Sequence, residues 1–134
     1  MEKMLTFLHT SSVHIPTFDG LLAELAPHVP ARHVVDESLL QEAREAGGVT
    51  VQLRQKLKEV ILSAMRDDTR VMLCTCSTLG GCAEEIGQHT AAPILRIDRP
   101  MAEKAVSLGT RIVVAATVAS TLGPTTELIL EAAR

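Results

Sequence analysis

Large aromatic residues are almost missing from this sequence. It contains no Trp or Tyr and only two Phe among its 134 residues. Proteins that bind single-stranded nucleic acid stack bases on such side chains. The Lys and Arg residues are also scattered, and the net charge is −3. We therefore expect no nucleic-acid partner. A flavin or nucleotide cofactor is disfavoured too, because no Gly-rich phosphate loop follows the first apolar run and no aromatic residue is placed to flank a flavin ring; we expect no cofactor.

The sequence also lacks a long apolar run. No run approaches the ~20 residues that cross a bilayer. The N-terminal residues do not contain an apolar stretch followed by a small-residue cleavage site. Hydrophobic residues nevertheless make up 46% of the chain, and its length suits one domain with a buried core. The sequence predicts a single cytoplasmic domain, residues 1–134, without a membrane partner.

Cysteine is scarce and unevenly placed. The three cysteines, Cys74, Cys76 and Cys82, lie within nine residues of one another. Secreted disulfide proteins distribute an even number of cysteines along the chain. A metal site needs about four ligands, and no His is adjacent to these three. We therefore expect no metal, and we interpret the segment as a local site in a reducing compartment.

Short apolar runs alternate with segments of helical periodicity. The expected strands are 4–9, 32–35, 71–74, 93–97 and 111–116. Helices are expected at about 18–25, from 50 to about 64, at 79–88, at 100–108 and from 123 to the C-terminus, whereas the polar segment 36–48 is expected to be a loop containing a short helix. This order predicts an α/β fold, namely a three-layer αβα sandwich around a parallel, flavodoxin-like doubly wound sheet of about five strands.

Ligands of such folds bind beyond the carboxyl ends of the strands. Hydroxyl side chains are frequent in the loops that are expected there, and with free backbone amides they suit a small anion such as a carboxylate. Ser and Thr also occur at strand–helix turns for capping alone. The candidate residues are Ser11, Ser12 and His14 after the first strand, Asp36 after the second, Ser77 and Thr78 after the third, and Thr117, Ser120 and Thr121 after the fifth.

The turn that contains Cys76 carries the most distinctive chemistry. Cys74 ends an apolar strand, so core packing explains it. Cys76 directly precedes a predicted helix, whose N-terminal amides and dipole favour the thiolate and lower the thiol pKa from its usual value of about 8.5. Such a thiol can exchange protons or act as a nucleophile. Cys76 as a small turn residue without chemistry, and a redox pair of Cys76 with Cys82, are open alternatives.

These residues resemble a known family. The strand 71–74 followed by Thr75-Cys76-Ser77-Thr78 resembles the first catalytic cysteine motif of the aspartate/glutamate/hydantoin racemase superfamily. Residues 35–39 resemble its acidic-Ser-Leu element, and residues 93–121 resemble its passage from the first lobe into the second. The similarity extends over essentially the whole chain, with 1–98 resembling the first lobe and 99–134 the start of the second.

The resemblance implies chemistry without a cofactor, in which one cysteine removes the α-proton of a small carboxylate and a second cysteine returns it. Relatives include arylmalonate decarboxylase and maleate isomerase. Carried over, Cys76 is the first acid/base. The positions implied to bind the substrate are Ser11, Ser12, Ser77, Thr78, Thr117, Ser120 and Thr121, with His14 and Asp36 as possible assisting residues.

The sequence departs from the family pattern in one respect. No Cys follows Cys82, so the second acid/base is missing. The chain is therefore expected to be a truncated or degenerate member, or one whose cleft is completed in a homo-oligomer. Two further hypotheses stay open: a non-catalytic module that binds a small anion or a partner, and a thiol redox sensor.

Overall fold

A parallel sheet forms the centre of the molecule. The computed structural model describes residues 2–134. The sheet contains four strands in the order β2-β1-β3-β4, and all three strand pairs are parallel. The strands are β1 (Met4–His9), β2 (Ala31–Val35), β3 (Thr69–Cys74) and β4 (Ile94–Arg96). The prediction of a parallel, flavodoxin-like α/β fold is confirmed, although the described residues form four strands rather than five.

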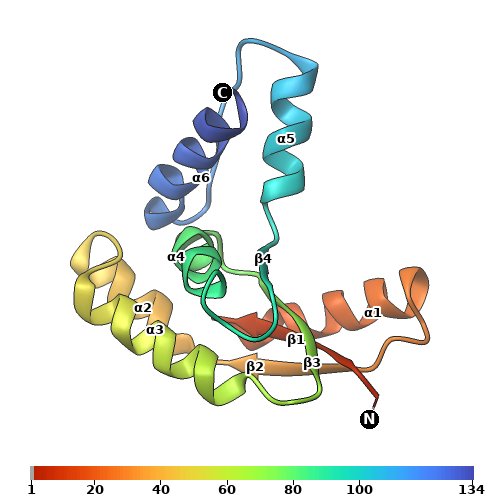
Figure 1. Cartoon of the computed structure of the whole chain (residues 1–134). Coiled ribbons are helices and arrows are strands. Elements are labelled where there is room, and N and C mark those ends of the chain that lie inside the picture. Colours follow the sequence, from red (N-terminus) through yellow and green to blue (C-terminus); the bar gives the residue numbers. More distant parts are fainter. Residues whose placement is uncertain (1) are drawn as a thin grey trace.

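Helices cover both faces of this sheet (Figure 1). On one face, Phe18 of α1 packs against Phe7 and His9 of β1. On the other face, residues of α2, α3 and α4 form the main apolar core with residues of β1, β3 and β4. The helical elements are η1 (Ser12–His14), α1 (Ile15–Leu25), α2 (Glu37–Ala46), α3 (Val51–Ala64), α4 (Ser77–Gly87), α5 (Arg99–Leu108) and α6 (Ala119–Ala132).

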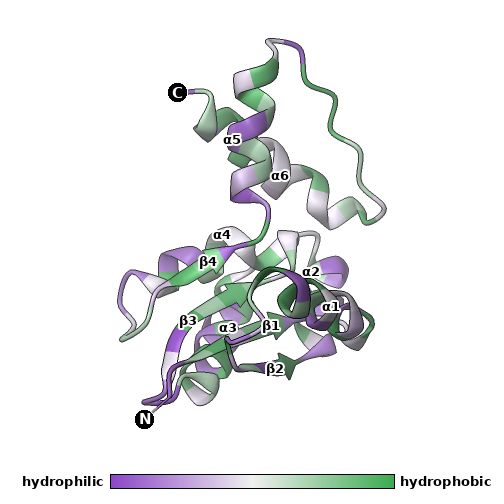
Figure 2. Ribbon diagram, turned by 90° about the vertical axis from the view of Figure 1, so that its right-hand side faces the viewer, coloured by the Kyte–Doolittle hydropathy of each residue, from purple (hydrophilic) through white to green (hydrophobic). Residues whose placement is uncertain are grey.

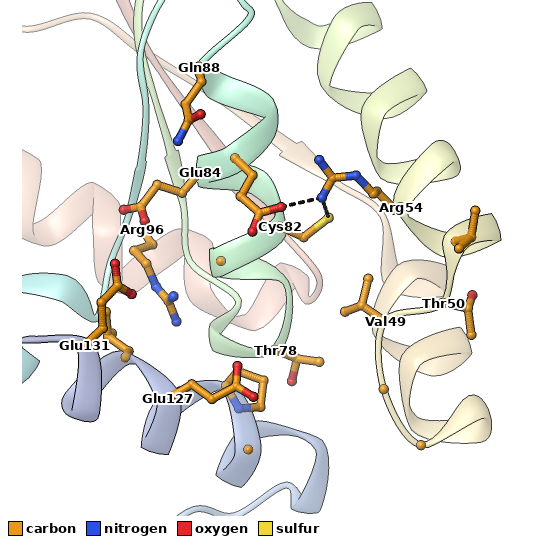
Figure 3. Close-up of a pocket in the computed structure, with 18 residues that line it drawn as sticks. Val49, Thr50, Arg54, Thr78, Cys82, Glu84, Gln88, Arg96, Glu127 and Glu131 are labelled. Carbon is orange, nitrogen blue, oxygen red and sulfur yellow. Dashed lines mark hydrogen bonds and ion pairs between the residues drawn. The ribbon is translucent and has the colours of Figure 1, made fainter.

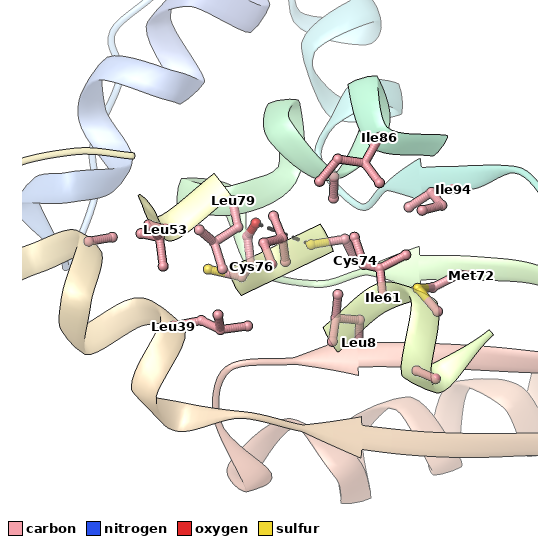
Figure 4. Packing of buried hydrophobic residues seen from close by; sticks show 14 residues of the cluster. Leu8, Leu39, Leu53, Ile61, Met72, Cys74, Cys76, Leu79, Ile86 and Ile94 are labelled. Atoms are coloured by element: carbon pink, nitrogen blue, oxygen red, sulfur yellow. Dashed lines mark hydrogen bonds between the residues drawn. The ribbon is translucent and has the colours of Figure 1, made fainter. Parts of the chain in front are cut away.

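The main core follows from the periodicity of the sequence (Figure 4). Leu53, Leu57 and Ile61 repeat at helical spacing, and each is at most 1% exposed. They face the alternate strand residues Met72 and Cys74, which point to the same side of the sheet. One amphipathic helix and one buried strand therefore produce most of this interface, as their patterns predict.

The segment 36–48 is a helix of ten residues, α2, rather than mostly a loop. Asp36 caps its N-terminus by accepting a hydrogen bond from the amide of Ser38 at 3.0 Å. Gly47 ends it with a φ of 74°, a left-handed conformation that glycine adopts without strain. Leu39 and Ala43, four residues apart, are completely buried. The segment is polar overall, so its composition did not indicate the narrow apolar stripe that packs against the main core.

The prediction of a fifth strand at 111–116 is wrong. These residues pair with no other strand among residues 2–134, and Val113 is 94% exposed. Figure 2 shows this apolar segment as an uncovered connection between α5 and α6. α5 carries the chain away from β4, so the segment has no neighbouring edge from which to take hydrogen bonds. α6 then begins at Ala119, four residues earlier than Gly123.

Residues 99–134 form a separate helical arm above the sheet body, residues 2–98 (Figure 1). α5 and α6 of the arm pack around Ala102, Leu128 and Ile129. α6 also packs against α4 of the sheet body. Among the described residues, no helix combines the length and the apolar character that crossing a membrane requires.

Candidate functional site

Three of the predicted hydroxyl residues meet where the arm touches the sheet body. Thr78 Oγ1 lies 3.1 Å from Ser120 Oγ and 3.3 Å from Thr121 Oγ1. Thr78 is in the first turn of α4 and is only 3% exposed. Ser120 and Thr121 are in the first turn of α6. Two helix N-termini therefore present hydroxyl groups to one another; we call Thr78, Ser120 and Thr121 the hydroxyl cluster.

The N-terminus of α4 has electrostatic properties that suit an anion. Cys76 is the N-cap residue, with extended backbone angles (φ −94°, ψ 113°), and its side chain accepts no capping hydrogen bond. The amide groups of the first turn of a helix have no partners within the helix, and they carry the positive end of its dipole. A carboxylate placed here would accept hydrogen bonds that the N-cap side chain does not accept.

The Cys76 side chain lies in the apolar core rather than in an open pocket. It is 9% exposed and belongs to the same cluster as Leu39, Leu53 and Leu79 (Figure 4). The expected arrangement, a thiol facing a pocket lined by alcohols, is not what the structure shows. Cys76 does lie directly before a helix, α4, as predicted. Its side chain turns toward α2 and α3, so a substrate reaches the sulfur only if neighbouring groups move.

Cys74 is a core residue, as its position at the end of a strand predicts. It is 1% exposed, and its Sγ donates a weak hydrogen bond to the carbonyl oxygen of Cys76 at 3.7 Å. Burial, with a smaller contribution from Cys76, raises the pKa of the Cys74 thiol to about 12. This thiol therefore stays protonated at neutral pH and does not react readily.

Cys82 is half-buried on the side of α4, with Arg54 Nη1 at 3.5 Å from its sulfur. Burial raises the pKa of the Cys82 thiol, and Arg54 opposes this shift. Cys76 and Cys82 are six residues apart on one helix, which corresponds to about 9 Å of helical rise. A disulfide needs Cα atoms within about 7 Å, so the two cysteines do not form a redox pair within this fold.

A pocket of about 770 Å³ adjoins the hydroxyl cluster (Figure 3). Its wall includes Thr78 of α4, the glycines Gly47 and Gly48 between α2 and α3, and residues of α6. Two arginines and four glutamates also line it; these are Arg54, Arg96, Glu84, Glu85, Glu127 and Glu131.

The arginines of this pocket are already paired. Arg96 is buried and donates two hydrogen bonds to Asp98, at 2.7 and 3.0 Å. Arg54 pairs with Glu85 at 2.6 Å. The excess of glutamates opposes the binding of an anion in the wide part of the pocket. The amide groups at the start of α4 and the Thr78 hydroxyl are the donors that this pocket offers a carboxylate, and Figure 3 shows the Glu127 carboxylate on the same side of the pocket as Thr78.

The structure places the remaining candidate residues elsewhere. Ser11 caps η1, with the amide of Val13 at 3.4 Å, and lines a smaller hollow of about 430 Å³. Asp36 caps α2 and accepts a hydrogen bond from the Ser38 hydroxyl at 2.5 Å, which explains this residue without a ligand. Four further candidates make no side-chain hydrogen bond within residues 2–134; Ser77 is half-buried, whereas Ser12, His14 and Thr117 are exposed.

Sequence reasoning missed a group of polar residues on the α1 face of the sheet. His9, His33 and Asp19 are joined by hydrogen bonds, which continue from His9 to the hydroxyl of Thr75. Burial above all, with contributions from His33 and His14, lowers the pKa of His9 to about 4. The sequence did contain one indication of this group: His9 and His33 both lie in segments predicted to be strands, and a polar side chain that is buried in a sheet normally has a hydrogen-bond partner.

Among residues 2–134, no three His, Cys, Asp or Glu side chains are arranged so that they could hold a metal ion. Comparison with known proteins gave no match: no family model, no curated protein and no solved structure is similar to the chain. The function must therefore be argued from the geometry of this site and from the resemblance in the sequence.

Proposed function

We propose that this chain binds a small carboxylate at the N-terminus of α4 and transfers a proton with Cys76, in the manner of a cofactor-independent racemase or isomerase of the aspartate/glutamate/hydantoin type. One observation carries the proposal: the hydroxyl cluster assembles two residues from Cys76, although Thr78 and Ser120 are 42 residues apart in sequence. Amides of a helix N-terminus together with hydroxyl donors form a typical carboxylate site.

Each residue has a distinct role in this proposal. The amides of α4 and the hydroxyls of Thr78, Ser120 and Thr121 hold the substrate carboxylate. The Cys76 thiolate takes the α-proton: the Cα–H bond breaks, an S–H bond forms, and the electron pair moves into the carboxylate to give an enediolate. Hydrogen-bond donors held around the bound carboxylate stabilise this charge as it develops. No step needs a cofactor.

The burial of Cys76 sets a condition on this chemistry. Cys76 is 9% exposed, whereas Cys74 is 1% exposed, so Cys76 is the less buried of the two thiols. We propose that substrate binding opens the contact of Ser120 and Thr121 with Thr78, and that the Cys76 side chain turns from α2 and α3 toward the bound carboxylate. The hydroxyls that now bind one another are then free to bind the carboxylate. The second acid/base comes from another copy of the chain in a cytoplasmic homo-oligomer.

Isotope exchange tests the catalytic role of Cys76. Aspartate, glutamate and a 2-substituted malonate are incubated with the protein in D₂O, and incorporation of deuterium at the α-carbon is followed by NMR. The Cys76→Ser variant is expected to reduce incorporation at least tenfold, because a serine hydroxyl is a far weaker acid than a thiol. Cys82→Ser is the matched control and is expected to retain exchange. Equal exchange by the wild type and Cys76→Ser would contradict the assignment.

A second candidate function is carboxylate binding without turnover, and the burial of Cys76 favours it. Calorimetric titration with the same acids distinguishes the two. Binding that Thr78→Val abolishes, without deuterium exchange in the wild type, would establish a binding module. Alkylation of the three cysteines by iodoacetamide over a pH series adds an independent readout, since an acid/base at Cys76 requires that its thiolate be reachable.

A further inference from the structure

A continuous chain of hydrogen bonds runs across the α1 face of the sheet. Thr75 Oγ1 lies 2.7 Å from His9 Nδ1, and His9 Nε2 lies 2.8 Å from His33 Nδ1. His33 Nε2 lies 2.7 Å from Asp19 Oδ1. The four residues come from the end of β3, from β1, from β2 and from α1. His9 is completely buried, whereas the side chain of Asp19 is 58% exposed.

The hydrogens of this chain have only one neutral arrangement. The Asp19 carboxylate can only accept, so His33 must donate from Nε2. His33 Nδ1 then accepts, which requires His9 to donate from Nε2. His9 Nδ1 accepts in turn, so the Thr75 hydroxyl donates to it. In this state every hydrogen points toward Asp19.

The addition of one proton reverses the chain. We propose that Thr75, His9, His33 and Asp19 form a proton switch, in which one proton taken up from solvent reverses the direction of the Thr75–His9 and His9–His33 hydrogen bonds. The Thr75 oxygen takes the incoming proton and gives its own hydrogen to His9 Nδ1. The His9 Nε2–H bond breaks as an Nδ1–H bond forms on His33. His33 becomes an imidazolium beside Asp19, and His9 stays neutral but changes tautomer.

The added positive charge is placed on His33 rather than on His9 because different groups face the two imidazole rings. His33 contacts the Asp19 carboxylate directly, and the nearby Arg32 is paired with Asp68 instead. His9 is faced by His33 from β2, by His14 from η1 and by Thr75 after β3. The Asp19 carboxylate of α1 raises the pKa of His9, but this is the smallest of the contributions, and Asp19 makes its hydrogen bond to His33 instead. Desolvation opposes an imidazolium at a buried position without an anionic partner.

The reversal changes the hydrogen bonding of a backbone carbonyl beside the cysteine loop. Thr75 Oγ1 also lies 3.3 Å from the carbonyl oxygen of Leu8, which already accepts a hydrogen bond from the Thr75 amide at 3.0 Å. After proton uptake the hydroxyl hydrogen points to this carbonyl. Leu8 then accepts two hydrogen bonds from the residue that directly precedes Cys76. This inference does not depend on the proposed catalytic function.

Nitrogen-15 NMR of the histidine rings in the intact chain tests the switch. As the pH falls from about 8 to about 5, the range in which histidines titrate, His33 is expected to become doubly protonated. His9 is expected to change from the Nε2–H to the Nδ1–H tautomer with the same midpoint and to remain neutral. A His9 that keeps one tautomer throughout, or that itself becomes an imidazolium at this midpoint, would overturn the proposal.

Variants at the ends of the chain make the test specific. Asp19→Asn removes an exposed carboxylate and is expected to lower the midpoint by roughly one pH unit. After proton uptake, the Thr75 oxygen accepts the hydrogen bond from His9 Nδ1. Thr75→Val removes this acceptor with little change in shape and leaves a buried N–H group unpaired, so it is expected to lower the midpoint, whereas Thr75→Ser preserves it. An unchanged midpoint in Asp19→Asn or in Thr75→Val contradicts the switch. Folding of each variant is checked by its amide spectrum.

Discussion

The sheet body and the helical arm contain similarly apolar sequences, but only the sheet body buries them in a large core. Its main core joins 14 buried residues from six elements. Within the described residues, the core of the arm consists of Ala102, Leu128 and Ile129. The run at 111–116 is as apolar as β3, yet five of its six residues are exposed, and only Val114 packs against the core of the arm. An apolar, β-branched sequence therefore specifies an extended backbone, whereas a strand also requires an adjacent edge.

The two regions meet through polar contacts more than through a shared core. The hydroxyl cluster joins α4 to α6, and Arg99 of the arm pairs with Glu84 of the sheet body. Such partly exposed polar contacts contribute little free energy. We therefore expect the arm to open at a lower free energy than the sheet body unfolds, and the following changes test that difference.

Substitution of one buried leucine in each region has the largest expected effect. Leu57→Ala removes a completely buried side chain of α3 and is expected to lower the free energy of unfolding by about 3 kcal/mol. Leu128→Ala, in α6, is expected to increase hydrogen exchange in α5 and α6 while the strands keep their protection. Equal loss of protection in both regions after Leu128→Ala would show that the molecule unfolds as one unit.

A pair of glycines tests packing within the sheet body. A Cβ atom at Gly87 would lie 2.8 Å from Ile94 Cβ and 3.1 Å from the Ile94 amide nitrogen. Gly87→Ala is therefore expected to cost about 2 kcal/mol through overpacking. Gly20 in α1 has nothing within 4 Å of that position, so Gly20→Ala is expected to stabilise the helix by about 0.5–1 kcal/mol. Urea denaturation measures both, and a stabilising Gly87→Ala would show that this close contact is absent.

The pH dependence of stability is expected to arise from the sheet body. The pKa of His9 is lowered to about 4 in the folded chain, from 6.5 as the ordinary value. Between these values the unfolded chain binds the proton that the folded chain excludes, so stability is complete above pH 6.5 and falls as the pH decreases toward 4. We expect the free energy of unfolding, measured by urea denaturation at a series of pH values, to fall by about 1–2 kcal/mol over this range. His9→Gln is expected to remove most of this dependence of the free energy of unfolding on pH. The control His14→Gln changes an exposed histidine and is expected to leave the dependence as it is. If His9→Gln also leaves it as it is, another group causes the pH dependence.

The contact between the two regions should show the smallest effect. Thr78→Val removes the hydroxyl that meets Ser120 and Thr121, and a neutral hydrogen bond contributes about 1 kcal/mol. Hydrogen exchange should increase in the first turn of α6 and remain unchanged in β1 and β3. Thr126→Val, in the same helix but bonded only to the carbonyl of Leu122, is the matched control. The same increase in hydrogen exchange in both variants would show that the contact between α4 and α6 does not depend on Thr78.

Three of the candidate residues lie together in the structure, but not from the elements in which they were expected. Ser120 and Thr121 were expected in the loop after a fifth strand; they meet Thr78, but from the first turn of α6. Hydroxyl residues ahead of a helical pattern mark a helix N-terminus whether or not a strand precedes it. The exposure of Cys76 was not predictable, since the direction of an N-cap side chain depends on the helices packed beside it.

The sequence by itself determined where four strands and most of the helices form, because periodicity and turn residues act over short distances. It placed Cys74 in the core and Cys76 at a helix start. Only the tertiary structure decided that residues 111–116 remain unpaired, that the Cys76 side chain turns inward, and that His9 and His33 are joined by a hydrogen bond. Each of these depends on groups far apart in the chain, and no local pattern records which of them will become neighbours.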